Sequence, residues 1–78
     1  MHEMGIASSI LEAVRKELVL YPGYRAAKVG VRVGAYSGVD PESLRFCFEA
    51  LSPLELVIEP ADGDELDLGS MELEEAHA

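Results

Sequence analysis

Apolar residues recur at helical spacing near the start of the chain. Over residues 4–20 they fall three and four positions apart, which predicts an amphipathic helix with one buried stripe. Pro22 and Gly23 end this helix, because proline cannot continue it and glycine favours the turn that follows. The stripe expected to be buried contains Ala7, Leu11, Val14 and Leu18, flanked by Met4, Ile6 and Ile10.

A strict alternation of apolar with charged or small residues follows over residues 27–34. This period of two predicts a strand with one buried face. Because glycine has no side chain, the other face is either uncovered or closely approached by a neighbour. The buried face should carry Ala27, Val29, Val31 and Val33, and the other face Lys28, Gly30, Arg32 and Gly34.

The segment that begins at Asp40 carries the signals of a second helix. Asp40 is a favourable N-cap, Pro41 suits the first helical position, and Glu42 suits the positive end of the helix dipole. Ser52 and Pro53 end the helix. The buried stripe should contain Leu44, Cys47, Phe48 and Leu51, with Phe46 beside it.

Alternation returns twice in the last third of the chain, over residues 54–59 and from residue 66 onward. Each stretch predicts a strand, and the first places Leu54, Leu56 and Ile58 on one face. Residues 60–64 are rich in turn formers and predict a hairpin connection. We therefore expect the last two strands to pair with each other in antiparallel fashion.

The last predicted strand contains an irregularity. Its apolar alternation starts at Leu66, slips by one residue at Gly69 and resumes at Met71, which predicts a β-bulge. Residues 74–78 should fray, and His77 should be disordered rather than a ligand.

The expected order of elements is helix, strand, helix, strand, strand. Each strand has one apolar face and each helix has one apolar stripe, so two layers bury these surfaces most economically. We expect an α+β two-layer sandwich, with two helices on one face of a three-stranded sheet. Residues 1–78 should form a single domain.

Composition narrows the function. The chain has 78 residues and 49% hydrophobic content, enough for one small core. Its single cysteine, Cys47, excludes an internal disulfide and a zinc site made of four cysteines. Neither a nucleophile with a partnering base nor a phosphate-binding loop is present, so we expect no enzyme. Without a leader or a membrane-spanning apolar run, the expected location is the cytoplasm.

The chain is strongly acidic, with a net charge of −9 from six basic and fifteen acidic residues. Nucleic acid is therefore excluded as a partner, because its phosphates would be repelled. Nine of the fifteen acids lie in residues 55–75. There they keep a sheet edge soluble, or they attract cations or a basic protein surface.

The amino-terminal triplet Met1-His2-Glu3 carries the candidate chemistry. The amine of Met1, the backbone amide of His2 and the imidazole of His2 lie close together on one segment. Once a metal displaces the amide proton, these three nitrogens form a nearly planar chelate, and Glu3 can add a carboxylate or amide ligand. Planar nitrogen and oxygen sets suit Ni(II) or Cu(II) better than Zn(II) or Mg(II). A bulky second residue keeps the initiator methionine in place, so His2 should remain second.

Several segments resemble one known family. Its opening motif is matched by MHEM at residues 1–4, IA at 6–7 and SIL at 9–11. Its middle motif is matched by SGVDPE at residues 37–42, LRF at 44–46 and FE at 48–49. Its last two strands are matched by LVIE at 56–59, GDEL at 63–66 and MELEE at 71–75. Over nearly its whole length the chain is similar to the HypA/HybF family of hydrogenase nickel-insertion proteins.

This resemblance implies a nickel metallochaperone domain. The family binds Ni(II) at its amino-terminal segment, here Met1, His2 and Glu3. It helps to load the ion into the [NiFe]-hydrogenase large subunit together with a nickel-handling GTPase, and some relatives also serve urease and its accessory proteins. Asp40 is a further candidate to complete or support the site, although its N-cap position already gives it a structural role.

The family also carries a zinc module with two CxxC pairs between its last two strands. Here residues 59 and 64 are joined by a short turn, and the cysteines of the module are missing. We therefore expect no zinc, and contacts that need the module cannot be carried over. The short form is either natural or the result of deliberate excision.

A second interpretation stays open. The chain is then a metal-independent, acidic protein-interaction or scaffold domain, natural or engineered, derived from the same family. Its surface would be the acidic last hairpin and sheet edge, and exposed strand edges make a homodimer or strand-swapped form plausible. Spectrophotometric titration with Ni(II) separates the two interpretations.

Overall fold

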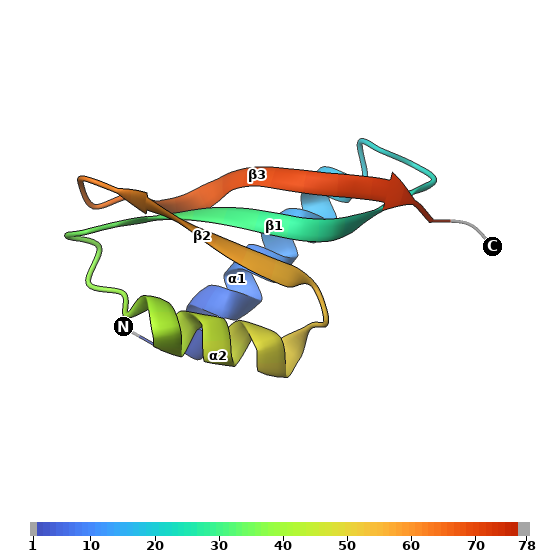
Figure 1. Cartoon of the computed structure of the whole chain (residues 1–78). Coiled ribbons are helices and arrows are strands. Elements are labelled where there is room, and N and C mark those ends of the chain that lie inside the picture. Colours follow the sequence, from blue (N-terminus) through green and yellow to red (C-terminus); the bar gives the residue numbers. More distant parts are fainter. Residues whose placement is uncertain (1, 77–78) are drawn as a thin grey trace.

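The structure, a computed structural model, describes residues 2–76. Its elements are α1 (Glu3–Leu18), β1 (Tyr24–Gly34), α2 (Pro41–Leu51), β2 (Glu55–Ala61) and β3 (Leu66–Glu75). Figure 1 shows a long, narrow sheet with both helices on one side of it. The expected two-layer α+β sandwich and its order of elements are therefore confirmed.

The pairing of the strands differs from the expected hairpin. β1 lies in the middle of the sheet, with β2 parallel to it on one side and β3 antiparallel to it on the other. The prediction that β2 and β3 pair with each other was wrong. A parallel pair needs a crossover connection, and α2 supplies it between β1 and β2.

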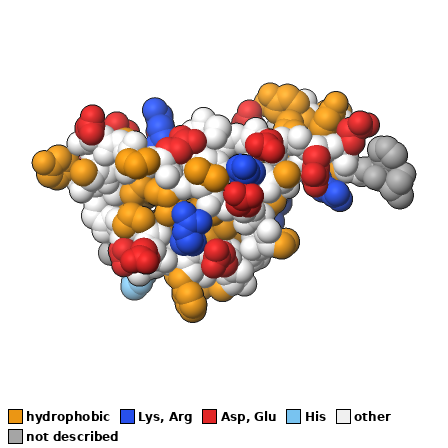
Figure 2. All heavy atoms as spheres, in the orientation of Figure 1, with side chains coloured by type: hydrophobic (Ala, Val, Ile, Leu, Met, Phe, Trp, Pro, Cys, Tyr) orange, Lys and Arg blue, Asp and Glu red, His pale blue; other side chains and the backbone are white. Residues whose placement is uncertain are grey.

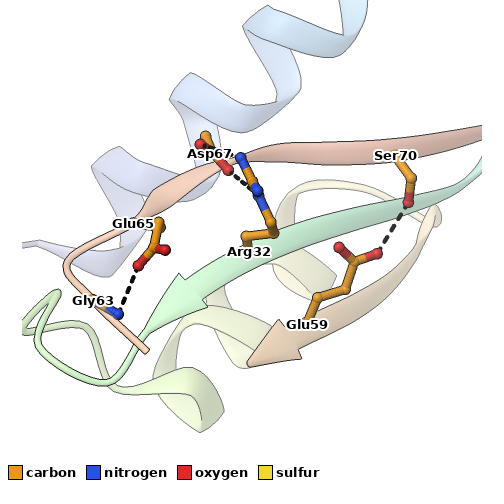
Figure 3. Close-up of polar contacts among 6 residues, drawn as sticks. All are labelled: Arg32, Glu59, Gly63, Glu65, Asp67 and Ser70. Atoms are coloured by element: carbon orange, nitrogen blue, oxygen red, sulfur yellow. Dashed lines mark hydrogen bonds and ion pairs between the residues drawn. The ribbon is translucent and has the colours of Figure 1, made fainter. Parts of the chain in front are cut away.

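Charge explains why β1 separates the other two strands. On the sheet face away from the helices, Nζ of Lys28 lies 3.8 Å from Glu55 of β2 and 3.9 Å from Glu72 of β3. Arg32 donates two hydrogen bonds of 2.9 Å to Asp67 of β3 (Figure 3). These bonds and the carboxylate charge raise the pKa of Arg32. Like charges opposite each other destabilise a sheet, so the basic strand belongs between the two acidic ones.

The register of β1 turns the apolar side chains of all three strands toward the helices. Val29 and Val31, which are fully buried, have apolar partners on both sides. The pairs are Val29 with Leu56 and Met71, and Val31 with Ile58 and Leu68.

Two β-bulges adjust the pairing of β1 with β3. The predicted bulge is confirmed: Gly30 pairs with Ser70 and Val31 with Leu68, so Gly69 is the extra residue. A second irregularity lies at Ala27, between paired residues 26 and 28. It reverses the local alternation, so Ala26 is buried and Ala27 only half-buried, which corrects the expected face.

The helices pack much as their patterns predict, with corrections at the outer positions. α1 ends at Leu18 rather than residue 20, and its buried residues include Ile10, whereas Leu11 is only half-buried. On α2, Cys47 is half-buried and Leu51 is exposed, because the stripe is narrower than expected. The buried helix residues are Ala7, Ile10, Val14, Leu44 and Phe48.

The connection between β2 and β3 wraps over the end of β1. Three successive backbone N–H groups of residues 34–36 donate to carbonyls of residues 61–65. A Cβ atom at Gly34 would overlap the backbone of Gly63, so this close approach requires glycine. The three bonds join Gly34 to Glu65 at 2.7 Å, Ala35 to Ala61 at 2.9 Å and Tyr36 to Gly63 at 2.8 Å.

The carboxyl-terminal segment is more ordered than expected. β3 continues to Glu75, and Arg25 donates to Glu74 at 2.8 Å. The backbone N–H of Ala76 donates to the carbonyl of Gly23 at 2.8 Å. Fraying from residue 74 is therefore wrong for residues 74–76, and His77 lies outside the described residues.

Large apolar side chains are exposed at the turn between α1 and β1. Val19, Leu20, Tyr21 and Tyr24 surround this turn, and Figure 2 shows hydrophobic side chains gathered at that end of the molecule. Neither helix in residues 2–76 combines the length and apolar character that a membrane crossing requires.

Candidate metal centre

His2 is the N-cap residue of α1. Its backbone is extended, with φ −98° and ψ 112°, and its carbonyl accepts the first hydrogen bond of the helix from Ile6 at 3.1 Å. Its side chain is exposed and makes no capping hydrogen bond. The imidazole therefore contributes no contact on which the described helix start depends, and it is accessible to a ligand.

The backbone amides at the start of α1 are accessible as well. The N–H groups before and within the first turn of an α-helix have no partner inside the helix. The amides of His2 and Glu3 belong to this set, so a metal can displace their protons without breaking a helical hydrogen bond. The positive end of the helix dipole disfavours a bare cation. Deprotonated amides carry the negative charge that offsets this repulsion.

Glu3 and Asp40 lie next to each other although 37 positions separate them. The backbone N–H of Asp40 donates to Oε2 of Glu3 at 3.4 Å, which is a long and therefore weak hydrogen bond. This contact brings the first turn of α1 beside the start of α2, as Figure 1 also shows. The structure thus unites two of the four candidate ligands.

The carboxylate of Asp40 is already engaged in α2. Its Oδ1 accepts from the N–H of Glu42 at 3.2 Å, and its Oδ2 accepts from the hydroxyl of Ser43 at 2.8 Å. The predicted N-cap is therefore confirmed. Because both oxygens accept local hydrogen bonds, Asp40 is better placed to support Glu3 through its N–H than to bind a metal.

We expect Asp40→Ala to lower the free energy of unfolding by about 1 kcal/mol, because the N-cap of α2 is lost. Asp40→Asn should keep the cap, since asparagine is an equally favourable N-cap residue. Chemical denaturation measures both changes, and Ni(II) titration of the folded Asn variant should match the parent. Loss of nickel binding in that variant would make the carboxylate itself a ligand.

The structure contains no conventional side-chain metal site within residues 2–76, since no three His, Cys, Asp or Glu side chains converge there. The chelate expected from the sequence needs only one imidazole, because its other nitrogens come from the main chain. Met1, which would supply the amine, lies outside the described residues.

A groove next to His2 was not foreseen from the sequence. It has a volume of about 660 Å³ and lies between α1 and β3. Its walls are mainly apolar; His2 lines it, and so does Asp67, whose carboxylate accepts hydrogen bonds from Arg32 on the opposite face of the sheet. The residues lining it are His2, Gly5, Ile6, Ser9, Ile10, Ala13, Leu66, Asp67 and Leu68. The small residues of α1 at positions 5, 9 and 13 could have indicated a groove, but the same pattern is typical of a solvent-exposed helix face.

Comparison with curated proteins gives a consistent set of relatives. The Hydrogenase maturation factor HypA of Chlorobium limicola is 43% identical over 68 residues, which cover 87% of this chain and 55% of that protein. The protein of the same name from Chlorobaculum tepidum is 41% identical over 69 residues, with 81% and 61% covered. That from Chlorobium luteolum is 38% identical over 69 residues, with 81% and 59% covered. The chain thus spans a little over half the length of these relatives.

No solved structure matches the chain. The family model described as "Hydrogenase/urease nickel incorporation, metallochaperone, hypA" matches residues 1–74, which is nearly the whole chain. The match begins at the segment that carries the candidate metal ligands and extends to residue 74 of β3. On this coverage, the chain belongs to the HypA family.

Proposed function

We propose that this chain is a nickel-binding domain that holds Ni(II) at its amino terminus and passes it on during [NiFe]-hydrogenase maturation. The proposal rests on the environment of His2. Its imidazole is exposed and makes no capping hydrogen bond, and the amides beside it have no hydrogen-bond partner within the helix that follows. The family description, which names nickel incorporation, supports the choice of metal.

The proposed ligands are the amine of Met1, the amide and imidazole of His2, and the carboxylate or amide of Glu3. Four donors of this kind form a square-planar set, which Ni(II) accepts readily. Asp40 supports the site by holding Glu3 through its backbone N–H. The imidazole of His2 is exposed, and only the Glu3 carboxylate is held by another element, through the N–H of Asp40. A recipient protein can therefore displace the donors one after another.

The proposed ion is cargo, so binding has to be reversible. Each proton that leaves the imidazole, the amine or an amide makes nickel binding tighter as the pH rises. Binding is therefore expected to weaken as the pH falls. Selectivity over Cu(II), which such donors bind more strongly, has to come from metal supply and docking.

We expect one equivalent of Ni(II) to produce the weak visible absorption band of square-planar nickel. Spectrophotometric titration of untagged protein tests this, with the intact Met1 verified by mass measurement. Protein acetylated at the Met1 amine is the matched control, because acetylation removes this one donor and leaves the rest of the chain unchanged, and it should not show the band. Absence of the band in protein with an intact Met1 would favour the metal-independent scaffold interpretation.

The partners belong to the same proposal. We infer a nickel-handling GTPase and the hydrogenase large subunit as recipients or helpers, with urease accessory proteins as further candidates. We also infer that residues 59–64 mark the place at which longer family members carry a zinc module. The bonds from residues 34–36 to residues 61–65 support this, because they fix the two ends of the connection on the sheet.

A further inference from the structure

β3 forms one edge of the sheet. It runs for 10 residues, Leu66–Glu75, and β1 pairs with one side of it only. Within residues 2–76, no other strand pairs with its outer side. On either side of the bulge at Gly69, every second backbone N–H and C=O group of β3 therefore points away from the sheet, and such an edge accepts an added strand.

The groove between α1 and β3 lies beside the first part of this edge, at residues 66–68. Leu66 and Leu68 form its wall on β3, and Gly5, Ser9 and Ala13 of α1 leave it open on the other side. In a strand added to β3, alternate side chains would point toward the helix layer. The groove can receive these side chains if they are apolar.

The open face of the sheet determines what the other side chains of an added strand should be. Charges alternate in rows across the three strands on this face, from an acid on β2 through a base on β1 to an acid on β3. One row contains Glu55, Lys28 and Glu72, and a second contains Glu59, Arg32 and Asp67, with the uncharged row of Val57, Gly30 and Ser70 between them. Figure 3 shows the second row, with Asp67 and Glu59 on opposite sides of Arg32.

A strand beyond β3 would lie opposite acids. Opposite charges in cross-strand pairs are stabilising and like charges are destabilising, so the next position in each row favours lysine or arginine. Glu72 is well exposed, with 67% of its side chain accessible, and its contact with Lys28 is a loose one at 3.9 Å. Its carboxylate therefore retains the capacity to pair with a second cation.

We propose that the outer edge of β3 binds an extended protein segment in which basic residues alternate with apolar ones. The basic side chains pair with Asp67 and Glu72 on the open face, and the apolar side chains enter the groove against α1. The backbone of the segment extends the sheet to four strands. This binding mode uses neither Ni(II) nor the chelate, so it stands independently of the proposed function.

A second copy of this chain fits the edge poorly. Pairing β3 with another β3 would place acids opposite acids, and pairing it with β2 would do the same, since Glu55 and Glu59 line that edge. The same charges that select a basic segment thus oppose the strand-edge homodimer that the sequence left open.

The test uses the metal-free full chain and two capped peptides as long as β3. In one peptide lysine and valine alternate, and in the other all lysines precede all valines. The alternating peptide should bind and should slow hydrogen exchange of alternate β3 amides, measured by NMR. Equal binding of both peptides would overturn the proposal, because charge alone would then explain it. Slower exchange of these amides at high protein concentration without peptide would also overturn it, in favour of a second copy.

Matched variants separate the groove from the charge rows. Ser9→Arg places a long cationic side chain in the groove and should abolish peptide binding, whereas Ser8→Arg adds the same charge on α1 outside it. Glu72→Gln should weaken binding about two- to fivefold, the size of one cross-strand charge pair. Glu49→Gln on α2 is its control and should have no effect. If Ser9→Arg and Glu72→Gln both bind like their controls, the proposed surface is wrong.

Discussion

Replacing His2 with alanine is expected to abolish stoichiometric Ni(II) binding while leaving the fold intact. The imidazole is the only side-chain nitrogen in the proposed chelate, and without it the chelate ring between the imidazole and the backbone amide cannot form. Its removal should cost little stability, less than about 0.5 kcal/mol, because the exposed side chain makes no capping hydrogen bond. Isothermal titration and thermal unfolding of parent and variant measure the two effects.

His77→Ala is the matched control, because it removes the other histidine of the chain and leaves the amino terminus unchanged. It should bind nickel as the parent does. Stoichiometric binding that survives His2→Ala and disappears with His77→Ala would move the site to the other end of the chain. A large loss of thermal stability in His2→Ala would show that the imidazole has a structural role after all.

Gly34→Ala is expected to destabilise the protein by about 3 kcal/mol. The added Cβ would overlap the backbone of Gly63, and neither main chain can move aside without disturbing the three hydrogen bonds that hold the β2–β3 connection. The loss should be seen as a lower midpoint in denaturant unfolding. Backbone rather than side-chain overlap makes this substitution severe, because no rotamer change relieves it.

Gly5→Ala provides the contrast for the same chemical change. A Cβ at Gly5 has no neighbour within 4 Å, and alanine is the better helix former. This variant should gain up to about 1 kcal/mol in unfolding free energy. If the two alanine variants changed stability equally, steric overlap at Gly34 would not be the cause of its effect.

The sequence predicted the layers correctly and the sheet order incorrectly, for a physical reason. Alternation reports which side of a strand is buried, and the valines of β1 met that prediction from Val29 onward. It carries no information on which strand lies beside which. The short turn at residues 60–64 suggested a local hairpin, yet the carbonyls of residues 61, 63 and 65 accept hydrogen bonds from the N–H groups of residues 34–36 at the end of β1.

The distribution of charge could have predicted the order of the strands in the sheet. Three of the six basic residues, Arg25, Lys28 and Arg32, lie on β1, while the open faces of β2 and β3 are acidic. Two acidic strands with one basic strand are most stable when the basic one lies between them. Alternation alone also failed at Ala27, where a bulge shifts the pattern by one residue.

For the candidate site, the sequence named residues but not their arrangement. The N-cap at Asp40 was predicted from residue types, whereas the first helix was expected from residue 4 and begins at Glu3. Their contact was not, because it depends on how α1 crosses α2. The groove at His2 depends in turn on β3 being an edge strand, which follows only from the order of the sheet.

The central position of β1 also affects the order in which the sheet can form during synthesis. β1 is made early, but β3, its antiparallel neighbour, is joined to it through ion pairs such as Arg32 with Asp67, which are 35 positions apart. Until β3 has been synthesised, one side of β1 has no strand beside it, and nascent chains with bare strands of this kind are prone to aggregate. Closing this side of β1 therefore depends on long-range contacts, which form more slowly than the local contacts within the two helices.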